Sequence, residues 1–113
     1  MDLNQLPSVI RRYITASNKP DPAAFVDCFS ENAVVLDEGI KRIGKQAIQE
    51  WSEQNHFGAN VTLEPITVQK KGEEFVVTFK LDGTYDKAGL PDPLLLNFQF
   101  VIADEDIVSL RIV

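Results

Sequence analysis

Residues 12–37 read RYITASNKPDPAAFVDCFSENAVVLD, and this stretch decides the fold of the chain. It begins on an amphipathic helix with Tyr13 on the apolar side, and it turns at a Pro-Asp-Pro corner over residues 20–22. It ends on a short apolar strand that is closed by Asp37. A phenol and a carboxylate are thus directed toward a hydrophobic interior. They either form a site or serve as a core aromatic and a strand-ending residue.

The first half of the chain has the pattern of three helices. A helix over about residues 3–18 is predicted because apolar side chains recur at helical spacing, at Leu6, Val9, Ile10, Tyr13 and Ile14. Pro20 stops it, since proline disfavours helical geometry in the residue before it. Asp21 as N-cap and Pro22 at the first helical position predict a second helix to about residue 29. A third is expected over residues 44–55.

The second half alternates apolar and polar residues, which predicts strands. Strands are expected over residues 33–36, 61–70, 74–85, 93–103 and 107–113, with a turn at Gly72 and a loop over 86–92. Helices followed by antiparallel hairpins indicate an α+β fold with the helices on one face of the sheet. With 113 residues, the chain is expected to form one domain over 1–113.

Composition excludes several classes of function. The net charge of −6 and the pI of about 4.6 argue against general binding to nucleic acid or to anionic membranes. Cys28 is the only cysteine and His56 the only histidine, so an internal disulfide is impossible and a zinc site of the usual ligands is not expected. We expect Cys28 to be a small buried side chain and His56 to lie near the surface, with a place at a cavity mouth as the alternative.

From the sequence we expect neither a secretory signal peptide nor a membrane-spanning segment. Its first residues lack a basic segment followed by an apolar one, and no apolar run reaches the roughly 18 residues of a membrane span. A single cysteine, which cannot form an internal disulfide, fits a reducing compartment, so we expect a cytoplasmic protein.

Three segments resemble the nuclear-transport-factor-2-like superfamily, also called the cystatin-like α+β cone: RRY at 11–13, the run over 18–37, and GKQAIQEW at 44–51. The resemblance covers nearly the whole chain. It implies three N-terminal helices packed on a strongly curved antiparallel sheet of four or five strands, with a cone-shaped cavity between them. Within the superfamily, the ketosteroid-isomerase-like and SnoaL-like proteins are the nearest in function.

The ketosteroid-isomerase pattern implies roles for individual residues. Its oxyanion-hole tyrosine resembles Tyr13 and its general-base aspartate resembles Asp37, and both would be catalytic. Its second oxyanion donor, an aspartate before a strand pattern similar to residues 97–100, corresponds to Leu96, so that donor is missing here. The implied pocket is lined by Trp51, Phe79, Leu96, Phe98 and Leu110.

Two functions remain open from the sequence. The first is a SnoaL-like protein that binds a small hydrophobic molecule in an internal cavity, with isomerase, cyclase or hydratase chemistry, no cofactor and no metal. The second is a non-catalytic binding or assembly module that acts through the outer sheet face.

The outer sheet face mixes polar and apolar side chains. It is expected to carry Thr78, Lys80, Asn97, Gln99, Ser109 and Arg111, interspersed with Val76, Leu95 and Val101. Relatives of this fold commonly form homodimers through this face, and the same is expected here. The alternative is a solvated face of an antiparallel sheet.

Overall fold

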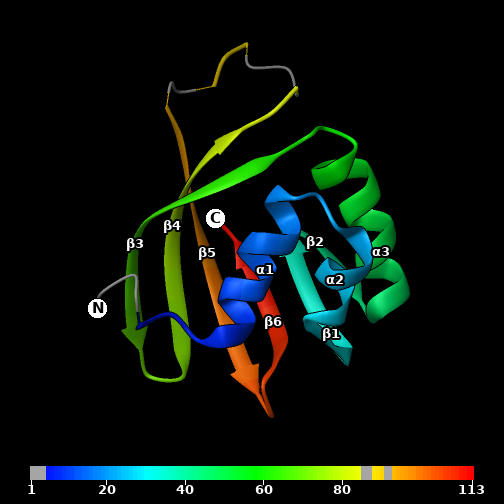
Figure 1. Cartoon of the computed structure of the whole chain (residues 1–113), viewed down its shortest axis with the longest axis vertical. Helices are drawn as coiled ribbons and strands as arrows, with labels where there is room; N and C mark the ends of the chain where they lie inside the picture. Colours follow the sequence, from blue (N-terminus) through cyan, green and yellow to red (C-terminus); the bar gives the residue numbers. More distant parts are fainter. Residues whose placement is uncertain (1–4, 85–87, 91–92) are drawn as a thin grey trace.

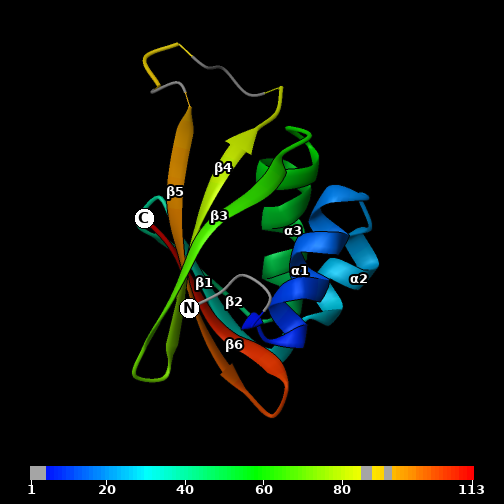
Figure 2. The ribbon, with the colours of Figure 1, turned by 60° about the vertical axis from the view of Figure 1, so that its left-hand side comes forward.

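The computed structural model describes residues 5–84, 88–90 and 93–113, and within them three α-helices cover one face of a six-stranded sheet (Figures 1 and 2). Figure 2 shows the two layers from the side, with the helices all on the same face of the sheet. The predicted α+β class and the cone-like arrangement are confirmed.

The first two helices lie close to their predicted positions, and the second is capped by a side chain. α1 (Ser8–Asn18) starts later than predicted, and residues 3–4 of the prediction lie outside the described residues. It ends at Asn18, just ahead of Pro20, as expected. α2 (Pro22–Asp27) is capped by Asp21, whose carboxylate accepts a hydrogen bond of 3.1 Å from the Ala24 amide.

The third helix changes its geometry part-way. α3 (Lys45–Ser52) is regular and buries Ile48 and Trp51. It then continues as a π-helix over Glu53–Phe57, in which the Gly58 amide donates to the Glu53 carbonyl, five residues back, at 2.8 Å. The sequence predicted one uninterrupted helix over 44–55, so the π-helix is a correction.

The sheet has the order β2-β1-β6-β5-β4-β3. Its strands, in chain order, are β1 (Phe29–Asp37), β2 (Ile40–Ile43), β3 (Thr62–Lys71), β4 (Glu74–Asp82), β5 (Leu94–Ala103) and β6 (Asp106–Ile112). β1 and β6 pair in parallel, whereas the other neighbours are antiparallel. The expectation of four or five purely antiparallel strands is therefore wrong in strand number and in one pairing.

The strand missed by the sequence reading is β2. It follows β1 through a two-residue turn in which Glu38 and Gly39 have φ of 54° and 75°, the left-handed geometry of tight hairpins. The guanidinium of Arg42 donates to the Asp37 carbonyl at 2.9 Å and so stabilises this turn. The hairpin fixes the end of β1, and with it the position of Asp37.

The remaining boundaries agree with the sequence to within a few residues. β4 ends at Asp82 and β5 begins at Leu94. Tyr85 and most of the predicted loop 86–92 lie outside the described residues. Over the described ranges, no helix has both the length and the apolar character needed to cross a bilayer.

A cluster of aromatic rings around Phe25 joins the helices to the first strand. Phe25 is fully buried, and its ring centroid lies 4.8 Å from Tyr13, 5.7 Å from Phe29, 6.3 Å from Trp51 and 5.3 Å from both His56 and Phe57. These rings come from α1, β1, α3 and the π-helix. One side chain of α2 therefore sets the spacing of the whole helical layer.

The end of α1 is fastened to the edge strand β3 by one side chain. Asn18 donates from Nδ2 to the Leu63 carbonyl at 2.9 Å and accepts from the Leu63 amide at 2.8 Å. This contact substitutes for a strand neighbour at that point of the sheet edge.

We expect Asn18→Ala to lower the free energy of unfolding by about 1–3 kcal/mol, because it leaves both backbone groups of the buried Leu63 without their partner. Urea unfolding measures the change. The exposed Asn32→Ala serves as control and should stay within about 0.5 kcal/mol of wild type. An equal effect of both substitutions would contradict this role of Asn18.

Candidate functional site

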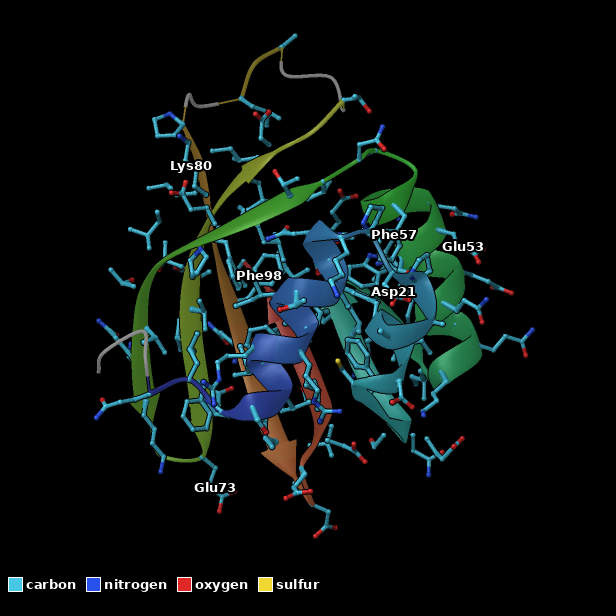
Figure 3. All side chains as sticks on the ribbon, viewed as in Figure 1. Asp21, Glu53, Phe57, Glu73, Lys80 and Phe98 are labelled. Atoms are coloured by element: carbon cyan, nitrogen blue, oxygen red, sulfur yellow. The ribbon has the colours of Figure 1, made fainter. Side chains whose placement is uncertain are left out.

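A cavity of about 420 Å³ lies between the helices and the sheet. The helices contribute Tyr13, Gln54, Asn55 and His56 to its wall, whereas the sheet side is apolar except for Asp37 and Glu38 at the end of β1. The lining residues are Tyr13, Asp37, Glu38, Trp51, Gln54, Asn55, His56, Ala59, Val61, Leu81, Leu90, Leu94, Leu96, Phe98 and Ile112. Phe98, labelled in Figure 3, projects from β5 between the two layers. This size is typical of a small-molecule site.

Tyr13 brings an unpaired hydroxyl to this cavity. The residue is 0% exposed, its ring packs on Phe25 and Phe100, and its hydroxyl oxygen has no hydrogen-bond partner among the residues that the structure describes. Burial, and then the nearby Cys28 and Asp37, raise the pKa of Tyr13 well above its ordinary value. The hydroxyl therefore stays protonated and can donate a hydrogen bond. The sequence also allowed Tyr13 to be an ordinary core aromatic. In that case its hydroxyl would be expected to have a partner, which differs from this geometry.

Asp37 is the last residue of β1, where the hairpin turns. Trp51 on α3 donates from its indole Nε1 to Asp37 Oδ2 at 3.1 Å. This bond connects the helical layer to the sheet and orients the carboxylate at the cavity wall. The carboxylate therefore stands as a hydrogen-bond acceptor in the same cavity as the Tyr13 donor.

His56 is placed quite differently from the expected surface position. It is only 5% exposed, lies against Phe25 in a near-parallel stack, and lines the cavity. Burial lowers its pKa to about 4, opposed by a hydrogen bond to the Ser17 backbone. A hydrogen bond that raises the pKa of a histidine favours the protonated imidazolium, so in this bond the ring is the donor. Since Nε2 has no partner among the described residues, we assign the donor nitrogen as Nδ1.

The π-helix explains how His56 reaches the interior. In a regular α-helix, residues five apart point roughly 140° away from each other, so His56 would face away from Trp51. The wider π turn reduces this angle, and both side chains line the cavity. Gly58 permits the turn, because a Cβ there would lie 2.5 Å from the Glu53 carbonyl oxygen. Helical periodicity in the sequence gave no sign of this.

The structure sorts the expected pocket residues into two groups. Trp51, Leu96 and Phe98 line the cavity together with Tyr13 and Asp37. Phe79 and Leu110 are fully buried core residues outside the lining, which corrects their predicted place. Leu96 presents a hydrocarbon where the ketosteroid-isomerase pattern has a second donor. The sequence reading missed the lining residues Glu38, Gln54, Asn55, Ala59, Val61, Leu81, Leu90, Leu94 and Ile112.

Cys28 is close enough to Tyr13 to affect its pKa but does not line the cavity. It is buried, its thiol donates to the Ala24 carbonyl at 3.4 Å, and burial raises its pKa to about 11. A thiol with so high a pKa is a poor nucleophile. In the described part of the chain, no three side chains of His, Cys, Asp or Glu are grouped so as to hold a metal ion.

A sequence profile described as the SnoaL-like domain matches residues 10–110. The chain belongs to this family. It is similar in structure to a candidate polyketide cyclase of Sinorhizobium meliloti, with 28% identity, a TM-score of 0.88 and all of both chains covered. It has no significant match among curated proteins.

Two other solved structures share the fold with this SnoaL-like protein. SalBIII, an epoxide hydrolase/cyclase-like enzyme of pyran ring formation in the polyether salinomycin, is 24% identical with a TM-score of 0.75, over 93% of this chain and 86% of its own. A Mycobacterium tuberculosis protein in complex with estradiol-17β-hemisuccinate is 11% identical with a TM-score of 0.75, over 93% of this chain and 89% of its own.

The low pKa of His56 predicts a specific pH dependence of stability. The unfolded chain takes up this proton near pH 6.5, whereas the folded chain resists it down to about pH 4. His56 therefore does not lower the free energy of unfolding above pH 6.5. As the pH falls from 6.5 toward 4, the unfolded chain is protonated at His56 while the folded chain is not, and the free energy of unfolding falls by up to about 3 kcal/mol. Urea unfolding at pH 7, 5.5 and 4.5 measures it.

His56→Gln is the comparison, because it removes this titration and leaves every carboxyl group in place. Its stability should fall less steeply over the same pH interval than that of wild type. Parallel curves for the two proteins would show that His56 does not resist protonation.

Proposed function

We propose that this SnoaL-like protein binds a small hydrophobic carbonyl compound in the cavity and catalyses proton transfer on it, as an isomerase, cyclase or hydratase would. The observation that carries the proposal is the buried Tyr13 hydroxyl, which has no partner within the described part of the chain and belongs to the same cavity as the Asp37 carboxylate. A buried donor left unpaired is costly, and a ligand oxygen would satisfy it.

The two groups suit the two halves of one reaction. Asp37 removes a proton from the carbon next to the carbonyl and becomes a carboxylic acid. The electron pair of that C–H bond forms the carbon–carbon double bond of the enolate, and the π pair of the carbonyl moves to its oxygen, to which the Tyr13 hydroxyl donates a hydrogen bond. Asp37 then returns the proton to carbon. With Leu96 in place of a second donor, stabilisation of the enolate is weaker by about 10²–10³-fold in rate than in a two-donor site.

The cavity wall supports a hydrophobic substrate. Leu94, Leu96 and Phe98 form an apolar surface opposite the polar helical side. The steroid ester bound by the M. tuberculosis relative and the cyclase chemistry of SalBIII favour a ligand of this type, since both proteins share the fold. No step of the proposed reaction needs a cofactor or metal.

Proton exchange on an aryl methyl ketone tests the chemistry without knowledge of the natural substrate. We expect the protein to accelerate the exchange of the methyl protons of 2-acetonaphthone in D₂O, followed by NMR. Asp37→Asn should lower the rate by about 10²–10⁴-fold, because the base is lost. Tyr13→Phe should lower it by about 10²–10³-fold.

Asp27→Asn is the matched control, since Asp27 is an exposed carboxylate on α2 outside the cavity lining. Its exchange rate should equal that of wild type. Undiminished exchange in Asp37→Asn would rule out Asp37 as the base. Binding of the ketone without any acceleration would favour a non-catalytic binding protein.

We also propose that the outer sheet face joins a second copy of the chain. Thr78 donates to Asn97 across β4 and β5 at 2.7 Å, and Arg111 donates to Gln99 across β5 and β6, so these polar groups are already paired within the chain. Leu95 is 49% exposed among them. Paired polar groups around exposed apolar ones suit a protein interface.

Light scattering after size exclusion tests the dimer. Wild type should have twice the 12.7 kDa mass of the chain, and Leu95→Glu should shift it toward the monomer because a charge would be buried at the interface. Ile40→Glu is the control. Ile40 is also exposed, but it is the strand partner of Asp37, so its side chain lies on the helical side of the sheet and outside the proposed interface. A wild-type monomer would refute the dimer.

A further inference from the structure

His56 carries a second unpaired polar atom in the cavity, and the proposed proton transfer does not use it. Its Nε2 is buried and has no hydrogen-bond partner among the described residues. The imidazole and the Tyr13 phenol both pack against Phe25, with ring centroids 5.3 and 4.8 Å from it, and both residues line the cavity.

The hydrogen-bonding character of Nε2 follows from what holds the ring. The hydrogen bond between His56 and the Ser17 backbone favours the charged ring, so the ring is its donor and a carbonyl in the last turn of α1 is its acceptor. Because Nε2 has no partner among the described residues, we assign the donor nitrogen as Nδ1. The neutral ring has only one N–H, and Nδ1 carries it. Nε2 therefore presents a lone pair and can only accept. Tyr13, which stays protonated, presents a donor.

The ring is also held rigidly in place. Phe25 stacks on one face of His56 and Phe57 meets it edge-on at 4.8 Å, while the π turn closed by Gly58 sets the backbone position. Figure 3 shows Phe57 at the end of the α3 segment that delivers this cluster. An acceptor fixed in an apolar surrounding discriminates strongly between ligands, because an unmatched buried polar group is costly.

We infer that His56 is a specificity-determining residue: its Nε2 accepts a hydrogen bond from a hydroxyl group of the ligand, so the cavity selects hydroxylated hydrophobic carbonyl compounds over the same compounds without the hydroxyl. This inference rests on the proposed function and narrows its substrate class. The ligand carbonyl accepts from Tyr13 and the ligand hydroxyl donates to His56, while Asp37 remains available for the proton at carbon.

Matched ketones test this selectivity. The probes are 2-acetonaphthone and isomers of it that carry one hydroxyl on different carbons of the distal ring, with affinity measured by fluorescence or calorimetry. At least one hydroxylated isomer should bind wild type about 3- to 10-fold more tightly than the parent ketone, the effect of one added hydrogen bond. His56→Phe keeps an aromatic ring on Phe25 and should abolish that preference.

Two further variants separate His56 from the other polar groups. Asp37→Asn should retain the preference, which excludes a hydroxyl bound to the carboxylate. Tyr13→Phe should weaken both ketones alike and also retain it. If the preference persists in His56→Phe, disappears in Asp37→Asn, or is absent from wild type, the inference is wrong while the proposed function stands. If no ketone binds, both fail.

The nitrogen signals of His56 give a readout that does not depend on affinity. Long-range ¹H–¹⁵N spectra at pH 7 should show a protonated Nδ1 and an unprotonated Nε2, and the Nε2 signal should move on addition of the preferred hydroxylated ketone but not of the parent. A proton on Nε2 in the free protein would overturn the inference, because that nitrogen could not then accept.

Discussion

The packing of five rings on Phe25 is the interaction on which the rest of the structure depends. It fixes α1 through Tyr13, β1 through Phe29, and the end of α3 through Trp51, His56 and Phe57. Aromatic contacts of this kind combine a large buried area with a defined geometry. The same cluster therefore stabilises the helical layer. It also sets the direction of three polar groups, namely the Tyr13 hydroxyl, the Trp51 indole N–H and the His56 imidazole. The side chains that hold the helices together are thus partly the same ones that line the cavity.

Local sequence patterns predicted the elements whose cause is local. The apolar spacing of residues 6–14 predicted α1, Asp21 and Pro22 predicted the start of α2, and alternation predicted the long strands. The β1–β2 hairpin also has a local cause that the strand prediction over 33–36 did not include: the two-residue turn Glu38-Gly39, followed by the short segment Ile40–Ile43. The parallel pairing of β1 with β6 could not be predicted in this way, because it depends on contacts between distant segments.

The candidate site was predictable only in part, for a similar reason. Resemblance to a known family pointed to Tyr13 and Asp37, and both line the cavity. His56 was expected near the surface because it follows the predicted third helix. A regular helix of period 3.6 would also direct it away from Trp51. One wider turn changes that direction, and its cause is a close backbone approach at Gly58 that helical periodicity does not encode. Phe79 and Leu110 were assigned to the pocket because the pocket and the core share one sheet face.

The position of β6 has a consequence for how the molecule assembles. The β1–β2 hairpin and the β3–β4–β5 meander are neighbours of β6 on opposite sides, and no other strand pairing connects them. The last strand in chain order is thus one of the two central strands of the sheet, and the two halves can join only after residues 106–112 have been made. Contacts of such long sequence separation slow folding, since much chain entropy is lost before they form. A nascent chain that lacks β6 exposes two unpaired strand edges, and these are the surfaces on which a chaperone or an aggregation partner would act.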